Sequence, residues 1–155
     1  MAADKTRHPD PSLLALGIKQ PWAELILRGI KTLEIRSQPT QVRGTVYVYA
    51  SRSDARGTWA EQAITRWQLE SATLPRGVLV GTVRIIDVRP FEPQDEPLAL
   101  IPSPAGYRLY AWVLSDPQRL VQPLPVRFLP YGVWFYPYKR KQTGTISPAG
   151  HNECS

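Results

Sequence analysis

The sequence predicts an α+β fold: a small mixed β-barrel of about five or six short strands with two helices packed at its mouth. The length of 155 residues gives one domain with a hydrophobic core and is too short for two domains of ordinary size. Shares of 43% hydrophobic and 21% charged residues are typical of a globular protein. Both helical patterns come early, and a run of strand patterns interrupted by prolines follows, which favours the barrel.

We expect three parts in the chain. Residues 1–12 and 142–155 are rich in Pro, Ser, Thr, Gly and Asn, which is typical of disordered tails. One folded domain is predicted over residues 13–138, and residues 139–155 form a tail that is first basic and then polar. No internal repeat and no break in composition divides the domain.

The first predicted element is a helix over residues 21–28. Proline suits the first helical turn, where its missing N–H is not needed. Trp22, Leu25 and Ile26 share one face at helical spacing. Gly29 is a natural C-terminal stop.

Two strands and a second helix are predicted next. Residues 32–36 alternate, with Leu33 and Ile35 on one face, which indicates a half-buried strand. Residues 45–50 are rich in β-branched and aromatic side chains and predict another strand. Apolar residues then recur with helical periodicity over residues 59–67, which predicts an amphipathic helix.

The rest of the domain reads as strands and loops. Gly81 suggests a bend within the first of the later strands. The proline-rich residues 90–104 are predicted to be a loop. Residues 120–128 contain Pro123 and Pro125, so they form an edge strand or an extended loop. The later strands are predicted over residues 77–88, 107–114 and 133–136.

Composition excludes several classes of function. The single cysteine, Cys154, rules out an internal disulfide framework. The two histidines, His8 and His151, lie in the predicted tails, so we expect no histidine-assisted nucleophile, no zinc site and no cofactor. No apolar run could span a bilayer, and the N-terminus lacks the apolar core of a secretory signal, so the expected location is the cytoplasm.

The charge balance points to an anionic partner. The formal net charge is +6, of which the C-terminal tail contributes two units and residues 1–12 none. The domain therefore carries an excess of about four positive charges, and nucleic acid is the commonest partner of such a surface. The alternative is a mildly basic, solvated surface without a partner.

The segment of residues 20–36, QPWAELILRGIKTLEIR, resembles the opening signature of ASCH domains, the small β-barrels related to the PUA RNA-binding fold. The pattern is a Pro-Trp pair, a short helix and then Gly-x-Lys-x-x-Glu-x-Arg. Two later segments, RGTVYVYAS and YAWVLSDPQRLVQPLPV, resemble further strands of the family, so that the resemblance spans about residues 14–136. The matching positions of the signature are Pro21, Trp22, Gly29, Lys31, Glu34 and Arg36.

The resemblance implies a PUA-like barrel that binds RNA or DNA. Some small bacterial ASCH proteins are amidohydrolases that deacylate N4-acetylcytidine, and at least one member is described as a ribonuclease. The amidohydrolases pair a lysine with a threonine three positions later, together with a separate glutamate. Lys31 matches that lysine, but Glu34 occupies the threonine position, and Thr32 is one residue from the lysine rather than three. This departure favours recognition over catalysis.

Lys31 follows a helix-terminating glycine and precedes a strand, which places it near the barrel mouth. As a cation it would hold a phosphate or a nucleobase carbonyl; as a neutral amine it would be a general base. A nearby Glu34 would keep the lysine protonated, which favours the binding role. The alternative is a surface ion pair between the two side chains, worth about 0–1 kcal/mol.

Glu34 and Arg36 lie on one face of their predicted strand. They offer an acceptor and a planar donor fork, which suit the edge of a nucleobase, or they pair with each other and hold the helix to the barrel. Trp22 is either core or a platform on which a base stacks. Ser51 and Arg52 end a predicted strand and are secondary candidates.

The leading hypothesis is a cationic pocket that binds RNA, or single-stranded or modified nucleic acid, through Trp22, Lys31, Glu34, Arg36, Ser51 and Arg52, without a metal. The alternative is a hydrolase of RNA or modified nucleosides, with Lys31 and Glu34 as catalytic residues. A third possibility is a protein-interaction domain. Further candidates for a phosphate-binding surface are Arg43, Arg56, Arg66, Arg76, Lys139, Arg140 and Lys141.

Overall fold

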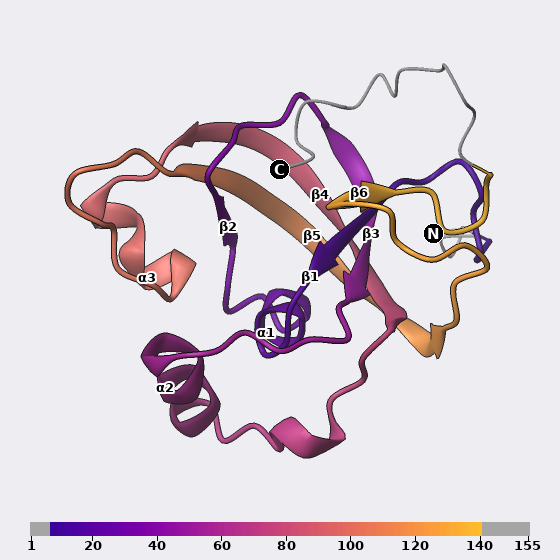
Figure 1. Cartoon of the computed structure of the whole chain (residues 1–155), viewed down its shortest axis with the longest axis horizontal. Coiled ribbons are helices and arrows are strands. Elements are labelled where there is room, and N and C mark those ends of the chain that lie inside the picture. The colour runs from indigo at the N-terminus through magenta and orange to yellow at the C-terminus, as the bar shows by residue number, and fades with distance from the viewer. Residues whose placement is uncertain (1–6, 141–155) are drawn as a thin grey trace, which may run out of the picture.

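The computed structural model describes residues 7–140, which form one six-stranded sheet with three helices. The strands lie in the order β2-β5-β4-β3-β1-β6 and curl into a half-barrel (Figure 1). The strands are β1 (Ala15–Ile18), β2 (Leu33–Arg36), β3 (Gly44–Ala50), β4 (Val78–Pro90), β5 (Tyr110–Leu124) and β6 (Trp134–Phe135). The helices are α1 (Trp22–Leu27), α2 (Thr58–Arg66) and α3 (Glu96–Ala99), with 3-10 turns η1 (Ser71–Thr73) and η2 (Pro93–Asp95). The predicted α+β fold is confirmed.

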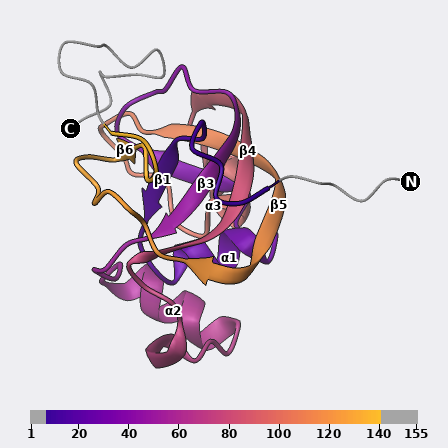
Figure 2. The same ribbon diagram turned by 90° about the vertical axis from the view of Figure 1, so that its right-hand side faces the viewer.

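The strand connections bring the segments that carry the candidate site residues to one end of the barrel. All neighbouring strands are antiparallel except β1 and β3, which run parallel with Ala15 opposite Tyr47 and Ile18 opposite Ala50. Parallel pairing places the carboxyl ends of β1 and β3 at the same edge. Helix α1 follows β1 directly and lies end-on at this edge in Figure 1, while Figure 2 shows α2 beyond it, outside the curled sheet.

Two parts of the structure contain elements that the sequence does not predict. Strand β1 was not predicted, because its four residues, ALGI, lie almost entirely in the interior and show no alternation. Residues 90–104, predicted to be a loop, contain η2 and α3. Their prolines, Pro93 and Pro97, occupy the first turns of these helices, where proline is tolerated. The barrel therefore has a third helix in addition to the two expected.

Strand β5 is longer than predicted and includes Pro123. It pairs with β4 from Pro90–Tyr110 up to Leu79–Leu124, but the register shifts between Leu79 and Gly81. Pro123 lies between Arg119, which is opposite Gly81, and Leu124, which is opposite Leu79, in the irregular part of this ladder, where a missing N–H is tolerated. For residues 120–128 the sequence predicts an edge strand or an extended loop, and in the structure residues 120–124 belong to β5.

The core joins α1 to the inner face of the curled sheet. Leu16, Val48, Ile85 and Trp112 are among its fully buried side chains. Helix α1 crosses close to β4 because Gly81 has no side chain. A Cβ at that position would overlap the Leu27 side chain and the Gln118 carbonyl oxygen. The bend expected at Gly81 coincides with a register irregularity of β4.

The described part of the predicted N-terminal tail, residues 7–12, packs against β3 rather than remaining free. The Tyr47 hydroxyl lies 2.6 Å from His8 Nδ1 and accepts a 2.7 Å hydrogen bond from the Asp10 backbone N–H. Tyr47 itself is fully buried, so these contacts satisfy a hydroxyl at the edge of the core. Residues 1–6 and 141–155 of the expected tails lie outside the described residues.

Candidate functional site

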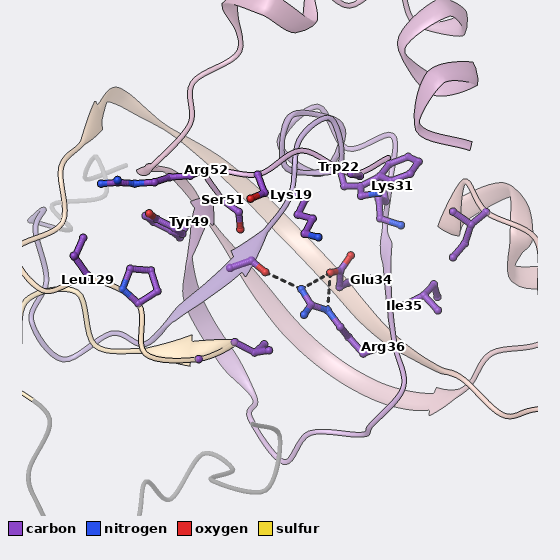
Figure 3. A pocket seen from close by; sticks show the side chains of 17 residues that line it. Lys19, Trp22, Lys31, Glu34, Ile35, Arg36, Tyr49, Ser51, Arg52 and Leu129 are labelled. Carbon is purple, nitrogen blue, oxygen red and sulfur yellow. Dashed lines mark hydrogen bonds and ion pairs between the residues drawn. The ribbon is translucent and has the colours of Figure 1, made fainter. Parts of the chain in front are cut away.

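A cavity of about 800 Å³ opens at the carboxyl ends of β1 and β3, and we call it the mouth pocket. Its walls come from β1, β2, β3, the start of α1 and a loop before β6 (Figure 3). All six side chains singled out in the sequence line it: Trp22, Lys31, Glu34, Arg36, Ser51 and Arg52. Four cations, including Lys19, and one carboxylate make the pocket electropositive.

The end of α1 positions Lys31. Gly29 adopts a left-handed φ of 75° and ends the helix, and the backbone N–H groups of Ile30 and Lys31 both donate to the Leu25 carbonyl. This tight turn directs Lys31 inward, where it is only 3% exposed. Its Nζ donates a 2.5 Å hydrogen bond to the Ala99 carbonyl at the end of α3. A helix C-terminus offers such unpaired carbonyls and favours a cation.

Burial changes the chemistry that the sequence suggested for Lys31. Desolvation lowers the pKa of its amine from 10.5 to about 8, and the Arg36 charge acts in the same direction, while Glu34 opposes them. Glu34 thus raises the pKa of Lys31, as expected from the sequence, but the effect of burial is larger. At neutral pH the amine is still mostly protonated. The surface Lys31–Glu34 ion pair considered from the sequence is not formed, since Glu34 pairs with Arg36.

Glu34 and Arg36 form a fixed pair on β2. Arg36 Nε and Nη2 donate to Glu34 Oε2 at 2.8 and 2.7 Å, and Nη2 also donates to the Gly17 carbonyl at 2.8 Å. Figure 3 shows these contacts at the centre of the mouth pocket. Among residues 7–140, Glu34 Oε1 and Arg36 Nη1 have no hydrogen-bond partner in the protein. Because Arg36 uses Nε and Nη2 for Glu34 Oε2, these two atoms lie at opposite ends of the pair, and an acceptor and a donor both remain available in the wall of the mouth pocket.

The Arg36–Gly17 hydrogen bond joins two strands that do not pair as a ladder. β2 and β6 are the two edges of the sheet, and β1 lies next to β6. The guanidinium also lies 5.6 Å from the Trp112 ring, which stacks on Trp134 with centroids 5.8 Å apart. Arg36 thus closes the half-barrel with a side chain at the point where its ladder is open.

Trp22, Ser51 and Arg52 contribute to different walls. Trp22 is half-buried: it packs against the core and also lines the cavity, with Lys31 Nζ 5.0 Å from its ring centroid. The two roles considered from the sequence therefore coexist in one side chain. Ser51 is half-buried, and Arg52 is exposed and lies over Gly77.

The sequence did not single out several pocket residues. Lys19 follows β1 and points into the cavity (Figure 3), but without a predicted β1 nothing placed it there. Tyr49 and Ser53 lie close in sequence to Ser51 and Arg52, the two residues that the sequence predicts at the end of β3. A loop that includes Leu129 and Gly132 forms the opposite rim. This loop reaches the site because β6, which follows it, pairs with the distant strand β1. Knowledge of that pairing would have been needed to predict the loop as part of the site.

The other candidate phosphate contacts do not converge on the mouth pocket. Arg76 forms a bidentate ion pair with Asp54 at 2.6 and 2.9 Å and donates to two carbonyls, so it holds a loop together. Arg43 donates to the carbonyls of its own loop. Arg66 lies over Trp67, and Lys139 over Tyr136. Arg56 and Arg140 are exposed, and Lys141 is outside the described residues.

Over residues 7–140, no group of three or more His, Cys, Asp or Glu side chains gathers in a way that could hold a metal ion. Within the same range, no helix has both the length and the apolar character required to cross a membrane.

The sequence model of the ASCH domain matches residues 16–125, which include the three strands and the helix that build most of the mouth pocket. The chain belongs to the ASCH domain family. Activating signal cointegrator 1 of Homo sapiens is 28% identical over 123 residues. The match covers 72% of this ASCH domain chain and 20% of that protein, so this chain spans about a fifth of the relative's length.

Solved ASCH structures share the fold. The crystal structure of ASCH from Zymomonas mobilis superposes with a TM-score of 0.56 at 15% identity, over 82% of this chain and 88% of that one. A crystal structure of a mutant of the Zymomonas mobilis protein gives a TM-score of 0.54 at 14% identity, over 79% and 88% of the two chains. At such identities the likeness shows the fold alone.

Proposed function

We propose that this ASCH domain binds single-stranded RNA by holding one nucleotide in the mouth pocket. The observation that carries the proposal is the fixed Glu34–Arg36 pair in the pocket wall, which leaves one carboxylate oxygen and one guanidinium nitrogen without a protein partner. Nucleobases present amino donors and carbonyl or ring-nitrogen acceptors, which these two groups can bind. The pair is already held by the barrel, so little side-chain ordering is lost on binding.

The cations of the mouth pocket suit the phosphate of the bound nucleotide. Lys19 and Arg52 are exposed cationic side chains at the rim, whereas Lys31 is a buried charge in the wall. Trp22 offers an aromatic surface next to the Lys31 amine. Aromatic stacking together with a cationic rim is the usual way in which proteins hold unpaired bases.

Fluorescence anisotropy with a labelled, short, random-sequence single-stranded RNA at low salt tests the proposal. We expect Lys19→Gln and Lys31→Met each to weaken binding about tenfold, because a hydrogen bond to a charged group contributes about 1.5 kcal/mol or more. The matched control is Arg84→Gln, which removes one charge from an exposed residue of β4 outside the pocket. It should bind within about twofold of the wild type.

Two results would overturn the proposal. One is a wild-type protein that does not bind the RNA even at low salt. The other is equal binding by the pocket variants and the control, which would leave only a diffuse charge effect. Circular dichroism of Lys31→Met establishes that the variant is folded before its affinity is compared.

A hydrolase is the second candidate because the pKa of Lys31 is lowered to about 8. A lysine with that pKa supplies a useful fraction of free amine near neutral pH and could act as a general base. The ASCH resemblance supplies the substrates to try, N4-acetylcytidine and RNA. Acetate release or metal-independent RNA cleavage that disappears in Lys31→Met would support this candidate, and a protein inactive on both substrates would remove it.

A further inference from the structure

A second cavity, of about 380 Å³, lies between α2 and the α3 segment, and we call it the α2–α3 groove. Its floor and walls are formed by aromatic and apolar side chains that include Trp59 and Trp67. Neither residue has a part in the function proposed above. Figure 1 shows α2 and α3 near each other at the left of the view, with α3 beside β2.

Trp59 gives the groove an aromatic surface that is about half exposed. Trp59 is 47% exposed, although it belongs to the helix whose buried positions, Ala60 and Ala63, already contact the core. Burying an indole contributes a large part of core and interface energies, so a half-exposed tryptophan in a concave surface is typical of a binding site. The Arg66 guanidinium lies 4.4 Å from the Trp67 ring, which adds a second planar surface.

The groove adjoins the mouth pocket. Ile101 lines both cavities, so its side chain lies between them. Trp22 of the mouth pocket and Trp67 of the groove also pack against the same small cluster around Leu25. The base that follows the one in the mouth pocket therefore needs to pass only this side chain to reach the α2–α3 groove.

The charges of the groove suit a nucleobase better than a second phosphate. Glu96 Oε2 accepts two hydrogen bonds from Ser103, which lower the pKa of this carboxyl and keep it ionised. A carboxylate repels phosphate but accepts a hydrogen bond from an amino group. Arg66 and Glu96 together leave the lining without excess charge, unlike the mouth pocket.

We propose that the α2–α3 groove is a second nucleotide subsite, in which the base next to the one in the mouth pocket stacks on Trp59 and Trp67. The inference rests on the proposed function and sharpens it: the ligand is an oligonucleotide of at least two residues rather than a free nucleoside. The binding energy is divided between polar contacts in the mouth pocket and stacking in the groove.

Binding of the same labelled random-sequence RNA to Trp59→Ala tests this subsite. Loss of one stacked base is expected to weaken affinity by about 5- to 150-fold, since such contacts contribute about 1–3 kcal/mol per base. Trp59→Phe, which keeps a stacking surface, should retain most of the affinity. The matched control, Tyr107→Ala, removes an exposed aromatic side chain that lines neither cavity and should bind as the wild type does.

A second readout locates the contact directly. With RNA that contains 4-thiouridine, ultraviolet irradiation should attach the nucleotide to the peptide that carries Trp59 and Trp67, and this product should diminish in Trp59→Ala. Both effects are expected at a salt concentration where the wild type binds tightly.

The outcomes separate this inference from the proposed function. If Lys19→Gln weakens binding and Trp59→Ala does not, the groove is not a nucleotide subsite, a peptide becomes its more suitable occupant, and the mouth-pocket proposal stands. If Trp59→Ala weakens binding and the mouth-pocket variants do not, RNA binds at the groove rather than in the mouth pocket, and the proposed function is overturned. If neither weakens binding, both proposals fail.

Discussion

Among single residues, Lys31 has the environment with the clearest measurable consequence. It is 3% exposed and is held by the Ala99 carbonyl and the Trp22 ring rather than by a carboxylate. The unfolded chain keeps the lysine proton up to a pKa of about 10.5, whereas burial lowers the folded pKa to about 8. Between these values the unfolded state binds more protons, so the free energy of unfolding rises with pH.

We therefore expect the Lys31 contribution to raise the free energy of unfolding by about 2 kcal/mol between pH 7 and pH 9.5. Urea unfolding at several pH values measures it. Lys31→Met lacks the titrating group, and subtracting its profile removes the effects of all other groups. Parallel profiles for the two proteins would contradict the lowered pKa.

At the scale of elements, the contact between α1 and β4 depends on the missing side chain at Gly81. A Cβ there would overlap both the Leu27 side chain and a backbone carbonyl of β5, and the carbonyl cannot move without disturbing the sheet. Gly81→Ala should therefore destabilise the domain by about 1–3 kcal/mol, as overpacked core substitutions do.

Chemical denaturation of Gly81→Ala and Gly17→Ala checks this expectation. Gly17 is the matched control, because it also lies in a central strand but an added Cβ would meet its nearest neighbour at 3.5 Å, an ordinary contact distance. Gly17→Ala should change the free energy of unfolding much less than Gly81→Ala. Equal losses would show that the close approach of α1 is not the limiting feature.

Elements with a local periodic signal could be predicted, and those defined by distant partners could not. The helix that begins at Trp22, the alternation around Leu33 and the strand that ends at Ala50 carry their pattern in neighbouring residues, and the structure has each of them within about two residues. β1 lies buried between β3 and β6, so its apolar run has no polar face to reveal its period. α3 is four residues long and begins with a proline-rich turn.

The same distinction applies to the candidate site. Lys31, Glu34 and Arg36 are adjacent in sequence, and their convergence follows from one turn and one strand. Lys19 reaches the pocket only because β1 pairs in parallel with β3, which no local pattern specifies. The lowered pKa of Lys31 comes mainly from burial, and part of that burial is packing against α3, whose Ala99 carbonyl is 68 residues away.

At the scale of the whole molecule, the half-barrel concentrates charge at the end where its ladder is open. The formal net charge is +6, and the mouth pocket there has four cationic side chains against one carboxylate. The open end needs Arg36 to join β2 to β1, and the same side chain lines the mouth pocket. In the function proposed above, closure of the barrel and recognition of the ligand use one side chain.

This concentration of charge predicts a steep dependence of RNA binding on salt. If Lys19, Lys31 and Arg52 each neutralise one phosphate charge, log Kd should rise with log salt at a slope of about 2, because each neutralised phosphate of a single strand releases about 0.7 counterion. A fourfold rise in salt would then weaken binding by about 20-fold. Lys19→Gln should reduce the slope by about 0.7, whereas Trp59→Ala should lower affinity and leave the slope unchanged, since stacking releases no counterions. Anisotropy titrations over a range of potassium chloride concentrations measure both, and a slope near zero for the wild type would mean that the cationic pocket does not contact phosphate.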